Sequence, residues 1–159
     1  GTYEGVATMA TTMEKKKFSD GNATVYDFKI DSEQDVSIQI VAGTTANAVI
    51  KGLECDGIPL NIIDGNLVLE KEFVCLSTTN TDVKVGADGA EVEEKMETKF
   101  KSIDVSKEGT TLHIDAEIEF SQTESTNGSK TDEGNADSRY RFEGQLVGRY
   151  CHPRRRSIG

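Results

Sequence analysis

The stretch that decides the fold is 109–120, which reads Gly-Thr-Thr-Leu-His-Ile-Asp-Ala-Glu-Ile-Glu-Phe. Apolar residues occupy every second position from Leu112 to Phe120, and polar or charged residues occupy the positions between them. This period of two is that of a β-strand with one face in a core and the other in water. A helix would scatter the same residues around its axis. Each neighbouring segment must therefore supply a matching apolar face, because the core would otherwise stay open to water.

The same alternation recurs on both sides of this strand. It predicts a first strand at 2–13, a hairpin formed by 26–30 and 36–40 with its turn at 31–33, and a last strand at 139–150. The first and last strands share a pattern of tyrosine and glycine on their inward faces, so we expect these two strands to pair with each other.

The segment 91–103 fits two periods. Val92, Met96, Phe100 and Ile103 have helical spacing, but Val92, Met96 and Phe100 also share one strand face. The opposite strand face is entirely charged, since every second residue from Glu91 to Lys101 is a glutamate or a lysine. A helix would not account for this alternation. The pattern therefore favours a strand.

Polar stretches separate the expected strands. Asp64-Gly65 predicts a tight hairpin between two short strands. Residues 77–81 are expected to be a break before a short strand at 82–85, and residues 122–137 a polar loop long enough to be mobile or functional. The resulting fold class is all-β: an antiparallel up-and-down barrel of about eight to ten strands.

Length and charge limit the classes of function. With 159 residues, the chain suits one domain, which we place at 1–151, followed by a basic tail at 152–159 that contains Arg154–Arg156. The net charge of -10 argues against a nucleic-acid partner, because phosphate binding needs concentrated positive charge. No apolar run approaches the length of a transmembrane helix. No signal peptide is visible, so the protein is either cytosolic or has lost an export sequence.

The three cysteines are Cys55, Cys75 and Cys151. Because the number of cysteines is odd and no Cys-x-x-Cys motif occurs, the sequence predicts neither a disulfide scaffold nor a zinc site. At most one internal bridge can form, and buried free thiols are the alternative that the sequence leaves open.

Residues that could carry chemistry do not form a motif. His113 lies on the outward face of its strand, and Cys151 and His152 are adjacent, so on a strand they would point to opposite faces. Asp115, Glu117 and Glu119 share an outward face but lie too far apart to hold one metal ion without ligands from other strands. The acidic residues near Asp132 lack the order of a calcium loop. We therefore predict no catalytic residue, no metal site and no cofactor.

Five segments carry a more specific pattern: Gly1–Gly5, Ala48–Leu53, Gly57–Leu60, Gly65–Leu69 and Gly109–Leu112. They resemble the calycin-like β-barrel proteins of gut anaerobic bacteria. The resemblance implies a barrel similar in shape to lipocalins, exported after removal of a signal or lipoprotein sequence, with no assigned activity. It carries over no site residue.

Apolar and aromatic residues on the expected inner face are the candidate ligand-binding residues. They are Tyr26, Phe28, Met96, Phe100, Ile118, Phe120, Tyr140 and Phe142. A barrel of about eight strands can fill its interior with side chains or hold one small ligand, and the sequence leaves both open. The leading hypothesis is a non-enzymatic, exported barrel that binds a small apolar or amphipathic molecule inside. The alternative is a filled barrel that acts as a structural or protein-interaction module at the cell envelope.

Overall fold

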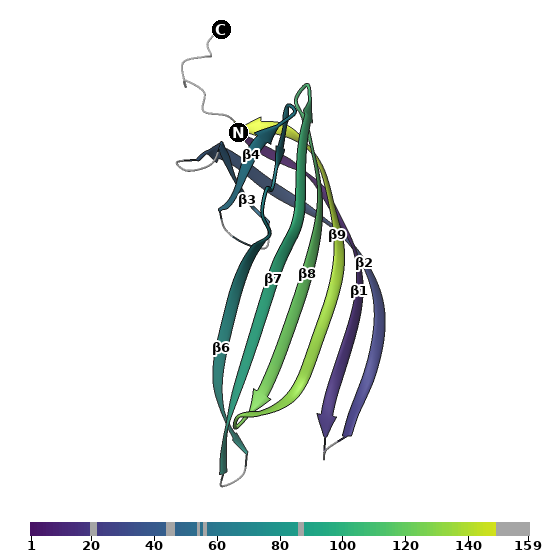
Figure 1. Ribbon diagram of the computed structural model, residues 1–159, viewed down its shortest axis with the longest axis vertical. Helices are drawn as coiled ribbons and strands as arrows, with labels where there is room; N and C mark the ends of the chain where they lie inside the picture. Colours follow the sequence, from purple (N-terminus) through teal and green to yellow (C-terminus); the bar gives the residue numbers. More distant parts are fainter. Residues whose placement is uncertain (20–21, 44–46, 54, 56, 86–87, 149–159) are drawn as a thin grey trace.

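Nine β-strands form one antiparallel sheet in the computed structural model (Figure 1), which describes residues 1–19, 22–43, 47–53, 55, 57–85 and 88–148. The described residues contain no helix. The strands are β1 (Thr2–Ser19), β2 (Asn22–Ala42), β3 (Ala48–Lys51), β4 (Ile58–Ile63), β5 (Asn66–Val68), β6 (Phe73–Val85), β7 (Asp88–Glu108), β8 (Thr111–Thr126) and β9 (Ser129–Gly148).

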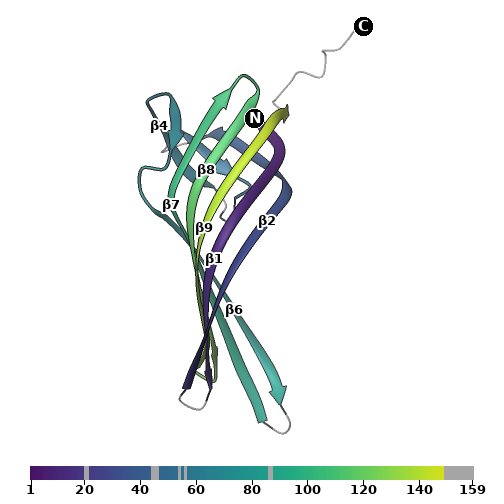
Figure 2. The same ribbon diagram turned by 90° about the vertical axis from the view of Figure 1, so that its right-hand side faces the viewer.

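The sheet closes into a ring at one end only. Its order is β5-β4-β3-β2-β1-β9-β8-β7-β6, and the ring is completed where Leu67 and Val68 of β5 pair with Val105 and Asp104 of β7. Further along, β6 pairs with the same edge of β7. The long strands continue past the ring as an open sheet, with β2 on one side and β6 on the other (Figures 1 and 2). We call these two parts the closed half and the open half.

The core fills the closed half. Its largest fully buried side chains come from five strands of the ring: Ile38, Ile50, Ile58, Leu60, Phe100, Ile103 and Ile118. Each contributes about 1.5–3 kcal/mol through burial of its apolar surface. The organising strand behaves as its alternation predicts, because Leu112, Ile114, Ala116 and Ile118 are all buried.

The predicted pairing of the first and last strands is confirmed. Tyr3 of β1 lies opposite Leu146 of β9, and Gly5 lies opposite Gly144. The ring, however, is completed elsewhere, by β5 and β7. The predictions of a strand at 91–103 and of a hairpin at Asp64-Gly65 are also confirmed, and both hairpin residues have positive φ.

Three predicted interruptions are wrong. The residues 31–33 lie inside β2, the residues 77–81 lie inside β6, and 122–137 is not a loop but the end of β8, a tight turn and the start of β9. The turn is Asn127-Gly128, where both residues have positive φ as a two-residue hairpin requires. The physical reason is shared: the open half has no core, so its strands carry polar residues without forming loops. The predicted tail and Cys151 lie outside the described residues.

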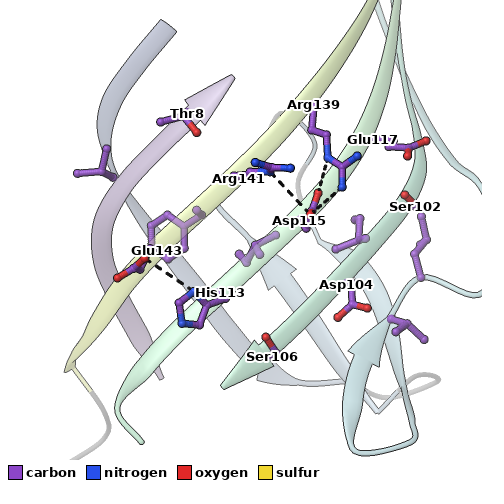
Figure 3. Close-up of a pocket in the computed structure, with 16 residues that line it drawn as sticks. Thr8, Ser102, Asp104, Ser106, His113, Asp115, Glu117, Arg139, Arg141 and Glu143 are labelled. Carbon is purple, nitrogen blue, oxygen red and sulfur yellow. Dashed lines mark hydrogen bonds and ion pairs between the residues drawn. The ribbon is translucent and has the colours of Figure 1, made fainter. Parts of the chain in front are cut away.

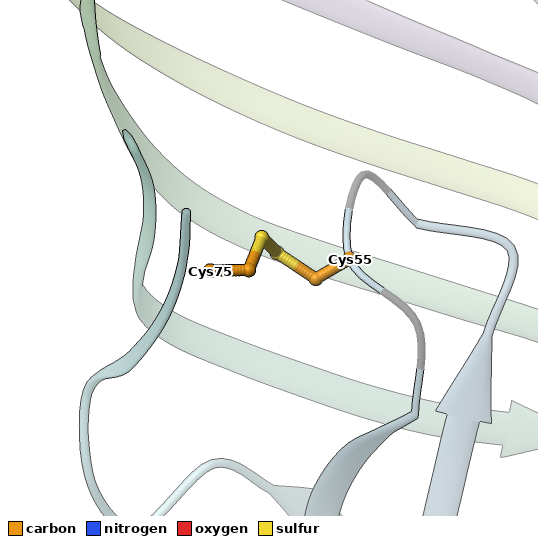
Figure 4. The surroundings of a disulfide bond; sticks show 2 residues. All are labelled: Cys55 and Cys75. Carbon is orange, nitrogen blue, oxygen red and sulfur yellow. A yellow bond between two sulfur atoms is a disulfide. The ribbon is translucent and has the colours of Figure 1, made fainter. Parts of the chain in front are cut away.

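A disulfide joins the connection between β3 and β4 to the start of β6 (Figure 4). It links Cys55 to Cys75 with a Cα–Cα distance of 6.1 Å, and Cys55 is buried in the core. The sequence left open whether the cysteines form one bridge or remain free thiols, and in the structure Cys55 and Cys75 are bridged. The bridge therefore links the β3–β4 connection to β6, the strand that runs from the closed half into the open half.

Candidate functional site

The structure divides the eight predicted ligand-binding residues into two groups. Phe100, Ile118, Tyr140 and Phe142 are buried in the core of the closed half. The other four lie further along the same sheet face: Tyr26, Phe28 and Met96 are 43%, 44% and 41% exposed, and Phe120 is half-buried. The members of the predicted set that remain accessible therefore lie in the open half.

Strand register places the exposed group on one face. One row across the sheet runs from Phe28 through Met13 and Ala136 to Phe120. The next row runs from Tyr26 through Lys15, Gly134 and Gln122 to Met96. Within β2, the rings of Tyr26 and Phe28 stack with their centroids 6.3 Å apart. We call this surface the open inner face.

Two lysines of β1 lie on the open inner face: Lys15 in the row of Tyr26 and Met96, and Lys17 beside Asp132 in the next row. Lys15 is half-buried and makes no ion pair with the described residues. Its neighbour on β9 is Gly134, where an added Cβ atom would meet nothing closer than 3.9 Å. Lys15 therefore lies in one row with Tyr26 and Met96, next to the row that contains Met13 and Phe28.

A cleft of about 1060 Å³ lies on the opposite, outward face (Figure 3). Its polar lining comes from β1, β7, β8 and β9: Thr8, Ser102, Asp104, Ser106, His113, Asp115, Glu117, Arg139, Arg141 and Glu143. Val6 and Val68 are among its apolar lining residues. The two arginines point toward Asp115, as the close-up shows.

Asp115 is the centre of this charged group. Arg139 donates two hydrogen bonds to it, from Nε to Oδ1 at 3.0 Å and from Nη2 to Oδ2 at 2.9 Å, and Nε of Arg141 lies 3.8 Å from Oδ2. The hydrogen bond from Arg139 lowers the pKa of Asp115, and the same bond raises the pKa of Arg139. Asp115 is therefore ionised at neutral pH and is unsuited to donate a proton.

Replacing Arg139 with glutamine should raise the pKa of Asp115 toward the ordinary value of about 3.9. A carboxyl with a lowered folded-state pKa stabilises the protein above its unfolded-state pKa, and this contribution disappears as the pH falls through the folded-state pKa. The stability difference between the wild type and Arg139→Gln should therefore narrow in acid. Carbon-detected NMR titration measures the pKa of Asp115. Lys101→Gln is the control, because it removes a different ion pair, in which Nζ of Lys101 lies 3.1 Å from Oε1 of Glu119. An unchanged Asp115 titration in Arg139→Gln would contradict the assignment.

The other residues considered for chemistry stay apart. Nδ1 of His113 lies 3.9 Å from Oε2 of Glu143, and His113 points outward as predicted. Asp132 and Glu133 are neighbours on β9, so they point to opposite faces of the sheet. Within the described residues, no three His, Cys, Asp or Glu side chains could hold a metal ion together.

The sequence reasoning did not find the cleft, because it placed the outward carboxylates in solvent and treated 122–137 as a loop. The missing signal was Asn127-Gly128. A two-residue hairpin at this point brings Arg139 and Arg141 of β9 beside Glu117 and Asp115 of β8.

No protein family and no curated protein matches the chain. Among solved structures, the ywiB protein from Bacillus subtilis is 14% identical, with coverage of 90% of this chain and 94% of that one and a TM-score of 0.22. The secretin InvG of the Salmonella SPI-1 type III secretion injectisome is 6% identical, with coverage of 94% and 60% and a TM-score of 0.19. Similarity at this level carries no argument about fold or function. In the described part of the chain, no helix has the length and apolar character needed to cross a membrane.

Proposed function

We propose that this protein is a non-enzymatic binding protein that takes a small apolar or amphipathic molecule on its open inner face. The observation that carries the proposal is the exposure of Tyr26, Phe28 and Met96 on one sheet face, beside a closed half already filled by its core. Large apolar side chains gathered on an exposed face favour binding, because covering them removes apolar surface from water.

Lys15 favours an amphipathic ligand with an acidic head group. Lys15, which forms no ion pair with the described residues, lies one row from Met13 and Phe28 and in the same row as Tyr26. A carboxylate or sulfonate could pair with Lys15 while an apolar tail covers Met13 and Phe28. An ion pair formed where bound apolar groups exclude water is stronger than one in free solvent.

We also propose that the fold is a barrel of the up-and-down, calycin-like type and that the protein works outside the cytoplasm. Consecutive strands pair throughout, except where β5 skips β6 to reach β7, and this order supports the barrel assignment. The Cys55–Cys75 disulfide supports an extracytoplasmic location, because such bridges persist in oxidising compartments.

A second function, a protein-interaction module at the cell envelope, is favoured by a different observation. Among the described residues, β3 pairs with β2 only at Gln39–Ala42, so most of β2 has an edge without a partner strand. Unpaired edges are common sites of strand addition.

Replacing Phe28 with aspartate tests the binding proposal. Binding of the neutral fluorescent dye N-phenyl-1-naphthylamine, followed by fluorescence titration, should weaken at least tenfold, since burying one phenylalanine side chain is worth about 1.5–3 kcal/mol. Native mass spectrometry of protein purified from its own host would show whether a natural ligand is retained.

Val25→Asp is the matched control. Val25 lies on the same strand and is 50% exposed, but its odd position places it on the outward face. Its substitution should leave dye binding unchanged. Equal effects of the two substitutions, or no binding of the dye by the wild type, would overturn the proposal.

A further inference from the structure

The free edge of β2 presents a regular set of backbone groups. At the end of the strand, the N–H of Ile40 donates to the carbonyl of Gly1 at 2.9 Å, and the carbonyl of Ile40 accepts from the amino terminus at 2.8 Å. Backbone groups alternate sides along a strand, so the even-numbered residues of β2 bond to β1. The odd-numbered residues from 23 to 35 direct their N–H and C=O groups to the edge that lacks a partner strand among the described residues.

The side chains at these odd positions form an acidic row. Asp27, Asp31, Glu33 and Asp35 are exposed on the outward face of β2, and Lys29 is the one cation among them. None of the five forms an ion pair with another described residue. The even positions of the same stretch carry Tyr26, Phe28 and Ile30 on the open inner face, where they are 43%, 44% and 49% exposed.

We propose that an extended segment of a partner protein adds to the β2 edge as a further strand. This segment would alternate apolar residues, which extend the open inner face, with lysine or arginine residues, which face the acidic row. Backbone hydrogen bonds would provide affinity, and the cross-strand pairs of opposite charge would provide specificity. The inference rests on the second function proposed above and does not depend on a small ligand.

A second copy of this chain is a poorer partner. In a two-fold antiparallel pairing centred on Asp31, three of the five opposing pairs at positions 27–35 would join like charges, because Asp31 would lie opposite its own copy and Asp27 opposite Asp35. The other two would pair Lys29 with Glu33. Like charges directly opposite each other on neighbouring strands are destabilising. The row that favours a basic strand therefore opposes pairing between two β2 edges.

The test uses a labelled nine-residue peptide of alternating valine and lysine, and a matched peptide of alternating valine and glutamate. Fluorescence anisotropy should show that the full chain binds the valine-lysine peptide at least tenfold more tightly. Asp31→Pro should abolish this preference, because proline removes one N–H from the free edge while no bond to β1 is lost. Asp31→Asn keeps that N–H and should weaken binding by less than about threefold.

A charge-reversed variant needs no backbone change. Asp31→Lys combined with Glu33→Lys alters only exposed side chains and should favour the valine-glutamate peptide instead. The Asp31→Pro variant should still bind N-phenyl-1-naphthylamine like the wild type, which separates failure of the edge from failure of the open inner face. Equal affinity of the wild type for both peptides, undiminished binding by Asp31→Pro, or a stable homodimer through β2 would overturn the proposal.

Discussion

Replacing Gly5 with alanine is expected to destabilise the protein by roughly 3 kcal/mol or more, because the new methyl group would overpack a closed strand pair. A Cβ atom at Gly5 would overlap the carbonyl oxygen of Glu143 and the Cα atom of Gly144 on β9. Both are backbone atoms of a paired strand, so neither can move aside like the end of a flexible side chain. For a chain of this length the midpoint of thermal unfolding should fall by about 6–12 °C, measured by circular dichroism.

Gly134→Ala is the matched control on the same face of the sheet. A Cβ atom at Gly134 would meet only Cβ of Gln122 and the carbonyl oxygen of Glu14, each at 3.9 Å. Its effect on stability should stay within about 0.5 kcal/mol. Equal losses in the two variants would contradict the close approach of β1 and β9 at Gly5.

Loss of the Cys55–Cys75 disulfide is the second large effect. The two cysteines are 20 residues apart in sequence, and opening a loop of that size costs roughly 3 kcal/mol through the regained entropy of the unfolded chain. The Cys55→Ala, Cys75→Ala double variant should therefore unfold at a lower temperature than the wild type, as should wild-type protein treated with dithiothreitol.

Cys151→Ser provides the control for the disulfide. This variant keeps the bridge, so dithiothreitol should lower its unfolding midpoint as it does for the wild type. Reductant should have no such effect on the Cys55→Ala, Cys75→Ala double variant. A midpoint that is insensitive to reductant in Cys151→Ser would show that the bridge contributes little to stability.

The long strands of the closed half could be predicted from sequence because each of them has one face in the core and one in water. Leu112, Ile114 and Ile118 follow that alternation and are buried. The charged face opposite Phe100 likewise identified β7 as a strand rather than a helix. In these segments the hydrophobic pattern and the structure report the same physical constraint.

The open half could not be predicted in the same way. The strand residues near Ser32 and Gln122 are polar because no core covers them, and the pattern was wrongly interpreted as turns and loops. The closing strand β5 is only three residues long, so Leu67 and Val68 carry no periodic signal for their pairing with β7. The outward cleft needed the register set at Asn127-Gly128, which brings Arg139 and Arg141 beside Asp115.

Amide hydrogen exchange along β2, resolved by residue with NMR, tests the central claim that the sheet closes at one end and leaves the β2 edge free at the other. The amides of Phe28 and Ile30 should be protected, because even-numbered residues bond to β1. The amides of Asp27, Lys29 and Asp31 should exchange rapidly, because they face the free edge. Equal protection of both sets in the isolated protein would contradict this account.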